Sequence, residues 1–90
     1  MGSLNVHTQV LTSASLSISA SNNVFRVSIL CSSGNITVNG SSSFQGVASA
    51  PVTFGVGEGV TITSPSTNNP IDGLTIDASS GTADLVISTQ

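Results

Sequence analysis

Charged side chains are almost missing from this chain of 90 residues. It holds one Arg, no Lys, four acids and one His, which gives a formal net charge of −3 at pH 7. Proteins that bind nucleic acid draw much of their affinity from several Lys or Arg contacts to phosphate, and only Arg26 is present here. A basic face for binding a membrane surface is lacking for the same reason. We therefore expect neither a nucleic acid nor a membrane as a partner.

Long apolar runs and paired cysteines are also missing. No stretch reaches the run of about 18 apolar residues that a transmembrane helix needs. Residues 1–6 show no basic region followed by an apolar stretch, so no signal peptide is visible. Either the chain is made in the cytoplasm, as we expect, or its start has been trimmed. Cys31 stands alone, which excludes an internal disulfide and a cysteine-rich zinc site. It lies in an apolar run and is predicted to be a small buried hydrophobic residue.

Aromatic residues are scarce: the chain has three Phe residues and neither Trp nor Tyr. Carbohydrate-binding modules commonly stack sugars on exposed rings, so this scarcity weakens a lectin interpretation. It does not remove that interpretation, since Asn, Asp and Gly loops can bind sugars by hydrogen bonds alone. We expect Phe44 to plug a core or an interface rather than to carry a ligand.

Ser and Thr, which make up 28 of the 90 residues, alternate with Leu, Ile and Val almost throughout the chain. This period of two is typical of β-strands, and no segment keeps a helical period for long. Residues 1–90 are predicted to form a single all-β domain, a small antiparallel β-sandwich that is jelly-roll-like and has about eight short strands. A compact barrel is the alternative. The predicted strands span residues 4–11, 15–20, 24–32, 35–39, 52–56, 59–64, 73–78 and 83–88.

The alternation also predicts which side chains face the core. In the third strand Phe25, Val27, Ile29 and Cys31 share the inner face, while Arg26 and Ser28 share the outer one. The same parity places the following residues inward: Leu16, Ile18, Ala20, Ile36, Val38, Val52, Phe54, Val60, Ile62, Leu74, Ile76, Leu85 and Ile87. The opposite faces carry mainly Ser, Thr and Asn.

Glycines mark the predicted turns. Residues 32–35, Ser-Ser-Gly-Asn, are predicted to close a β-hairpin, and Asn39-Gly40 is a second turn signal. The segment 55–59, Gly-Val-Gly-Glu-Gly, lacks the Lys and the following helix of a phosphate-binding loop, so a glycine-rich β-turn is expected there.

Residues for acid-base chemistry are few. His7 lies near the start of the chain, on the strand face opposite Val6 and Thr8, and is expected to be a solvated edge-strand side chain. No G-x-S-x-G motif supports a serine nucleophile. We therefore predict that the protein is not an enzyme and expect no catalytic, cofactor-binding or metal-binding residues.

Three of the four acids lie close together in the sequence, within residues 71–87. Asp72-Gly73 is a common turn pair, because Asp bonds local backbone and Gly accepts a positive φ. Asp77 and Asp84 alternate with apolar neighbours and are expected on outward faces, where pairing with Arg26 or weak Ca²⁺ binding is the alternative. The D-x-D-x-D-G pattern of a calcium loop is missing. The sequence thus favours turn chemistry and solvated faces over one acidic site.

The predicted sheet lacks the usual protection at its edges, because the chain has no Lys and three prolines. We expect another copy of the chain or the surface of a larger assembly to cover them, so that the protein is a homo-oligomer.

Two segments strengthen this interpretation. The sequences FQGVASAPVTFGVGEGVTIT (44–63) and NPIDGLTIDASSGTADLVI (69–87) resemble the C-terminal half of small Ser/Thr-rich β-proteins of tailed bacteriophage virions. Such proteins decorate a capsid or form part of a fibre. The resemblance implies a virion component that docks on the capsid, with a trimer among the forms it implies. Its partner would be the major capsid protein or another virion protein, and the resemblance supplies no site residues. Two alternatives remain: an adhesin or carbohydrate-binding module, and a small β-sandwich enzyme that depends on His7.

Overall fold

The computed structural model of the protein describes residues 5–40, 51–64 and 68–89. Their strands are β1 (Asn5–Thr12), β2 (Ser15–Ile18), β3 (Val24–Asn39), β4 (Val52–Gly55), β5 (Gly59–Thr63), β6 (Leu74–Asp77) and β7 (Gly81–Thr89), with a single 3₁₀ turn, η1 (Ala20–Asn22). Every strand pair is antiparallel, and no α-helix occurs in these residues. The predicted all-β antiparallel class is confirmed.

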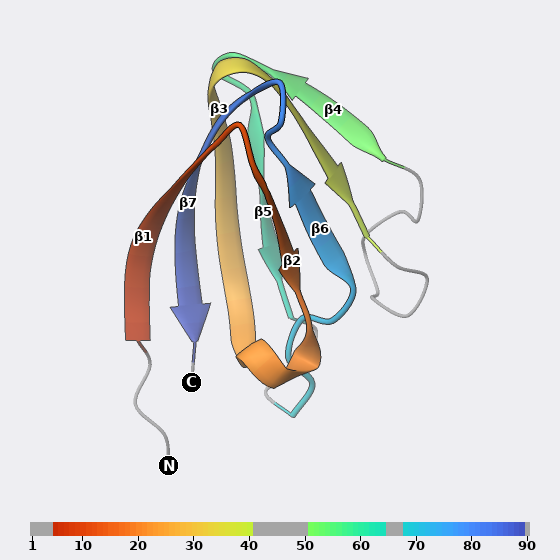
Figure 1. The fold of residues 1–90 in the computed structure, drawn as a ribbon. Coiled ribbons are helices and arrows are strands. Elements are labelled where there is room, and N and C mark those ends of the chain that lie inside the picture. The colour runs from red at the N-terminus through yellow and green to blue at the C-terminus, as the bar shows by residue number, and fades with distance from the viewer. Residues whose placement is uncertain (1–4, 41–50, 65–67, 90) are drawn as a thin grey trace.

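The strands follow one another end to end as four long segments (Figure 1). β1 runs on into β2, β6 into β7, and β4 into β5, while β3 is one strand of 16 residues. β3 pairs with β6 and β7 along one side and with β4 and β5 along the other. β1 and β2 pair in turn with β7 and β6. The order across the sheet is therefore β1/β2, β7/β6, β3, β5/β4.

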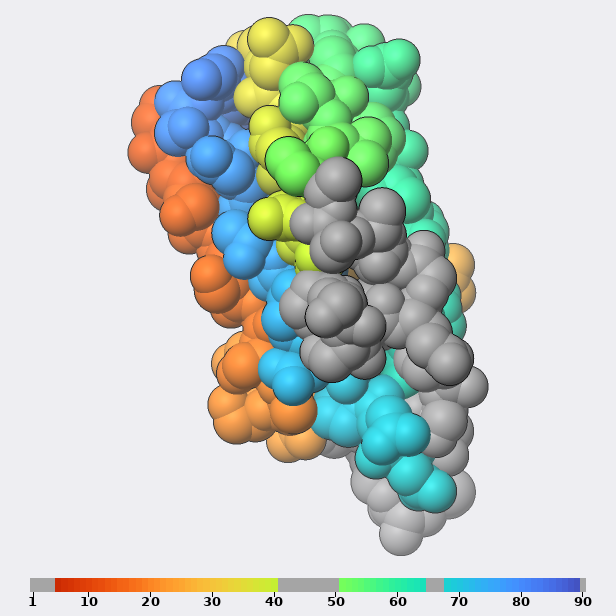
Figure 2. All heavy atoms as spheres, turned by 90° about the vertical axis from the view of Figure 1, so that its right-hand side faces the viewer, coloured from red at the N-terminus to blue at the C-terminus, as the bar shows by residue number. Residues whose placement is uncertain are grey.

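All four segments bend at about the same level, so the sheet curls over into a half-barrel (Figure 1). We call the two sides of the bend the long half (β1, β7, residues 24–34 of β3, and β5) and the short half (β2, β6, residues 35–39 of β3, and β4). Figure 2 views the molecule from the side of the short half, where β4 lies beside the end of β3. The sandwich and jelly-roll details of the prediction are not confirmed.

The bend in β3 corrects the hairpin predicted at residues 32–35. The ladder to β7 continues through Ser33 and Gly34, and a register shift between Cys31 and Ser33 marks a bulge. Gly34 has a φ of 63°, and a Cβ at this position would lie 2.2 Å from the Ser80 carbonyl oxygen. A glycine with a positive φ occurs in β-bulges as well as in turns. The predicted strands 24–32 and 35–39 are thus one strand, β3.

The glycine-rich segment 55–59 forms the expected turn, but this turn stays bonded to β3. The Gly57 N–H donates to the Cys31 carbonyl oxygen at 2.9 Å, and the Cys31 N–H donates to the Glu58 carbonyl oxygen at 2.9 Å. The Glu58 carboxylate accepts the Gly55 N–H at 2.7 Å. The turn therefore lets β4 and β5 follow the bend of β3.

The concave side of the half-barrel holds the core. Its buried side chains form one cluster among the described residues: Leu11, Ile18, Val24, Val27, Ile29, Cys31, Ile36, Val38, Ile62, Ile71, Leu74, Ile76, Ala78, Ala83, Leu85 and Ile87. Leu16, Phe54 and Val60 pack against it while partly buried. The inward parity is thereby confirmed for most of the predicted positions, including Cys31.

Three inward predictions are wrong. Phe25 is only half-buried, because a register irregularity between Val24 and Arg26 places Val24 in the core instead. Ala20 belongs to η1 and is exposed. Val52 begins an edge strand and is 48% exposed. The prediction for Phe44 lies outside the described residues.

Candidate functional site

The three acids of residues 71–87 lie at separate places in the structure and have different contacts. Asp72 accepts the Ala20 N–H at 3.2 Å, which ties the turn before β6 to η1. Asp77 accepts the Ser79 N–H at 2.9 Å in the turn between β6 and β7. Asp84 lies on β7 in register with Val10 and Leu30. Within the described parts of the chain, no group of three or more His, Cys, Asp or Glu residues is arranged to hold a metal ion.

Asp77 is held in its charged form. The Ser79 backbone N–H, followed by the Ser79 side chain, lowers the pKa of Asp77 from its ordinary value of 3.8, and burial opposes this only weakly because the carboxylate is fully exposed. The carboxylate is exposed, as the sequence predicts, and it also serves the turn, a role that sequence reasoning gave only to Asp72.

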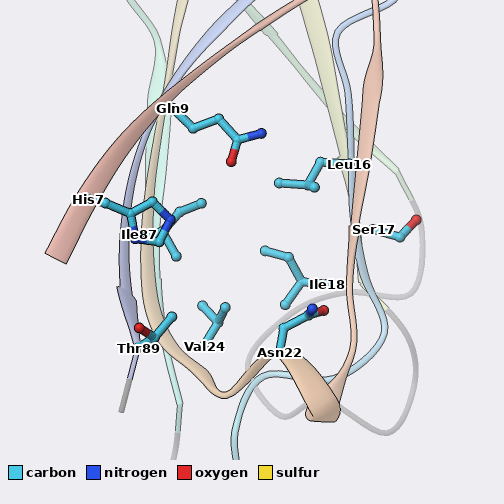
Figure 3. Close-up of a pocket in the computed structure, with 9 residues that line it drawn as sticks. All are labelled: His7, Gln9, Leu16, Ser17, Ile18, Asn22, Val24, Ile87 and Thr89. Carbon is cyan, nitrogen blue, oxygen red and sulfur yellow. The ribbon is translucent and has the colours of Figure 1, made fainter. Parts of the chain in front are cut away.

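A pocket of about 190 Å³ lies between β1 and β2, the two strands of the bent edge segment (Figure 3). His7 and Gln9 reach into it from β1, and Leu16 and Ile18 face them from β2. Its remaining lining residues are Ser17, Asn22, Val24, Ile87 and Thr89. His7 is exposed and lies on an edge strand, as predicted. The parity of β1 also turns it toward the concave side, a position that sequence reasoning missed.

The chemistry of this pocket is that of hydrogen bonding. None of its lining residues is an acid that could orient His7 as a base. The Ser17 hydroxyl points away from the imidazole (Figure 3). The Asn22 side-chain oxygen already accepts the Ser19 N–H at 2.8 Å. Above an aliphatic floor, the pocket thus offers one imidazole, two amide groups and the Thr89 hydroxyl, with no acid among its lining residues.

The second candidate is the convex side of the long half, which we call the outer face. Backbone register arranges its residues in three rows across β1, β7, β3 and β5. These rows are Val10, Asp84, Leu30 and Gly59; then Thr8, Val86, Ser28 and Thr61; then Val6, Ser88, Arg26 and Thr63. Hydroxyl groups join the strands where Ser28 and Thr61 bond at 3.1 Å.

Aliphatic side chains gather on the outer face. Among the described residues six large hydrophobic side chains are exposed, and four of them lie here: Val6, Val10, Leu30 and Val86, at 59, 65, 46 and 42%. A shallow hollow runs between Leu30, Thr61 and Val86, beside Gly59, which has no side chain to fill it. Exposed aliphatic side chains gathered on one face are typical of protein-interaction sites.

Sequence reasoning predicted hydroxyl-coated outer faces and missed this patch. The signal was present, however, as breaks in the alternation: Val10-Leu11, Ile29-Leu30-Cys31 and Leu85-Val86-Ile87. Where apolar residues are consecutive in a strand, one of them must point outward. Only the strand order shows that these outward residues meet on one face.

Arg26 and Asp84 are the charged residues of the outer face. They lie on neighbouring strands but four residues apart in register, because Asp84 is opposite Leu30. That offset is about 13 Å at the rise of a β-strand, too long for an ion pair. The predicted alternative of a cross-sheet pair with Arg26 is therefore wrong for Asp84. Asp77 belongs to the short half.

Comparisons with known proteins give no family. No family model matches the chain, and no curated protein or solved structure is similar enough to it to count as a match. Among the described residues there is also no helix of the length and apolarity needed to cross a membrane.

Proposed function

We propose that the protein is a non-enzymatic structural component of a virion, which decorates or stabilises a phage capsid through protein–protein contacts. Its partners in this proposal are the major capsid protein or another virion protein, together with further copies of the chain. The protein is made in the host cytoplasm and resides in the particle. The observation that carries the proposal is the outer face, where four exposed aliphatic side chains share one surface with few charges.

The edges of the long half support the same proposal. Within the described residues, β1 pairs with β7 alone and β5 with β3 alone, so each leaves one row of backbone groups unpaired in the sheet. Neither strand contains Lys or Pro, the residues that commonly guard an edge. An assembly that covers these edges accounts for their composition. The likeness of residues 44–63 and 69–87 to phage virion proteins supplies the kind of assembly.

Mass spectrometry of purified particles tests the proposal. Lysates of cells that carry the gene would be fractionated on density gradients, and the chain quantified against the major capsid protein. We expect many copies per particle, which remain bound through repeated banding. A chain that stays in the soluble fractions while particles form would contradict the proposal.

The pocket beside His7 supports one alternative, a carbohydrate-binding module. Imidazole and amide groups above an aliphatic floor are groups that can bind a sugar. A glycan array separates the two functions. Binding by the isolated protein that is lost on Gln9→Ala and kept in Val56→Ala would favour the alternative, whereas no binding is expected for a structural protein.

A further inference from the structure

The outer face carries one positive and one negative side chain that cannot reach each other. Arg26 lies in the third row and Asp84 in the first, on the neighbouring strands β3 and β7. Within the described residues neither side chain forms an ion pair or a hydrogen bond. Each charge is therefore available to a partner of the opposite sign.

A surface with this pattern is complementary to itself. In a two-fold symmetric contact, if residue i of one copy meets residue j of the other, then j also meets i. One operator thus brings Arg26 over Asp84 of the other copy and Asp84 over its Arg26. The same two-fold rotation therefore forms two ion pairs, and both charged side chains of this face are paired.

The residues between the two charges suit a dry contact. The middle row consists of Thr8, Val86, Ser28 and Thr61, and its flanks hold Val6, Val10 and Leu30. These side chains are short, so two such sheets can approach to the distance of about 10 Å that is usual for packed faces. The Ser28 and Thr61 hydroxyls bond to each other at 3.1 Å, which reduces the cost of removing them from water.

From this pattern we propose that the outer face binds the outer face of a second copy of this chain, about a two-fold axis, with Arg26 of each copy paired to Asp84 of the other. The inference rests on the proposed function in one respect, since it names a contact through which the structural protein assembles. It adds a two-fold contact at this face to the trimer that the resemblance to phage virion proteins implies.

Charge exchange tests the pairing directly. The full-length protein and the variants Arg26→Asp, Asp84→Arg and the double exchange would be compared by sedimentation equilibrium from micromolar to millimolar concentration. Each single variant places like charges together twice, so its dimer Kd should rise about tenfold or more. The double variant restores opposite signs and should return to within about threefold of the wild type. Added salt should weaken the wild-type dimer.

A matched pair of variants tests the apolar part of the face. Val10 on β1 and Val56 in the turn after β4 are each 65% exposed, so Val10→Asn and Val56→Asn make the same uncharged change at equal exposure on different surfaces. Val10→Asn should raise the dimer Kd about tenfold or more, because an amide is buried without a partner, while Val56→Asn should leave the Kd unchanged. Thermal unfolding followed by circular dichroism shows whether both variants are folded.

Two results would overturn the inference: a wild-type protein that stays monomeric across the whole concentration range, or a dimer whose Kd ignores the Arg26 and Asp84 exchanges. The particle experiment tests the proposed function separately from the dimer. A monomer that is found on particles would refute the self-association and leave the proposed function standing. A charge-dependent dimer that is missing from particles would support the self-association and refute the proposed function.

Discussion

Asp77 shows how this chain uses one of its few charges. Its carboxylate accepts a backbone hydrogen bond two residues on, from Ser79, and so closes the turn that joins the two halves of the sheet. The segment reads as a cluster of acids, yet Asp72 and Asp77 bond to different turns and Asp84 belongs to the outer face. Period-two parity and turn chemistry predicted this separation without the structure.

The hydrogen bond from Ser79 predicts the acid response of the turn. Because the folded-state pKa of Asp77 lies below 3.8, its contribution to stability is present above that value and is lost as the pH falls through the folded pKa. A carboxyl-carbon NMR titration should show a midpoint below 3.8 for Asp77. Ser79→Ala removes only the smaller, side-chain contribution, so most of the lowering should remain. A midpoint at or above the ordinary value would contradict the turn geometry.

Leu74 is a representative residue of the core. It is fully buried where β6 packs inside the curled sheet. Leu74→Ala should lower the free energy of unfolding by about 2–5 kcal/mol, because a cavity is left as well as apolar area lost. Val56→Ala, in an exposed turn, should change it by less than about 0.5 kcal/mol. Urea unfolding of both variants measures the difference, and equal effects would contradict the assigned core.

At the scale of elements, the bend in β3 determines the fold, and the sequence wrongly predicts a hairpin at this bend. Residues 24–32 and 35–39 read as two strands because Ser32, Ser33 and Gly34 carry the composition of a hairpin loop. The same glycine conformation serves a bulge, and the choice depends on which segment lies opposite. Here β7 pairs on both sides of the irregularity, so the strand continues. That long-range pairing leaves no local signal.

Gly34→Ala and Gly57→Ala compare a glycine in the bend of β3 with a glycine in an open turn. Both glycines have positive φ, 63° and 85°, so Ala is strained at either site. At Gly34 its Cβ would also lie 2.2 Å from the Ser80 carbonyl oxygen, whereas at Gly57 it meets nothing within 4 Å. Gly57→Ala should cost about 1–2 kcal/mol from strain alone.

Gly34→Ala should cost clearly more, about 3 kcal/mol or beyond, since β3 and β7 must separate at the bend. Chemical denaturation compares the two variants on one scale. Equal losses would mean that the close approach of β3 to the β6–β7 turn does not constrain the fold.

At the scale of the whole molecule, curling gives the single sheet two different surfaces. The concave side buries the core, with a hydrogen-bonding pocket between β1 and β2, while the convex side of the long half gathers aliphatic residues from β1, β3 and β7. The alternation predicted the core because it is a local property of each strand. The outer face depends on the strand order β1-β7-β3-β5, which the sequence does not reveal. The sequence shows only the separate breaks in the alternation on each strand.

The central claim is that this chain acts by assembling, and its copy number on purified particles tests that claim most directly. The account predicts a fixed ratio of the chain to the major capsid protein, reproduced between preparations and retained through repeated gradient banding. Particles that form normally and contain no copies of the chain would contradict it.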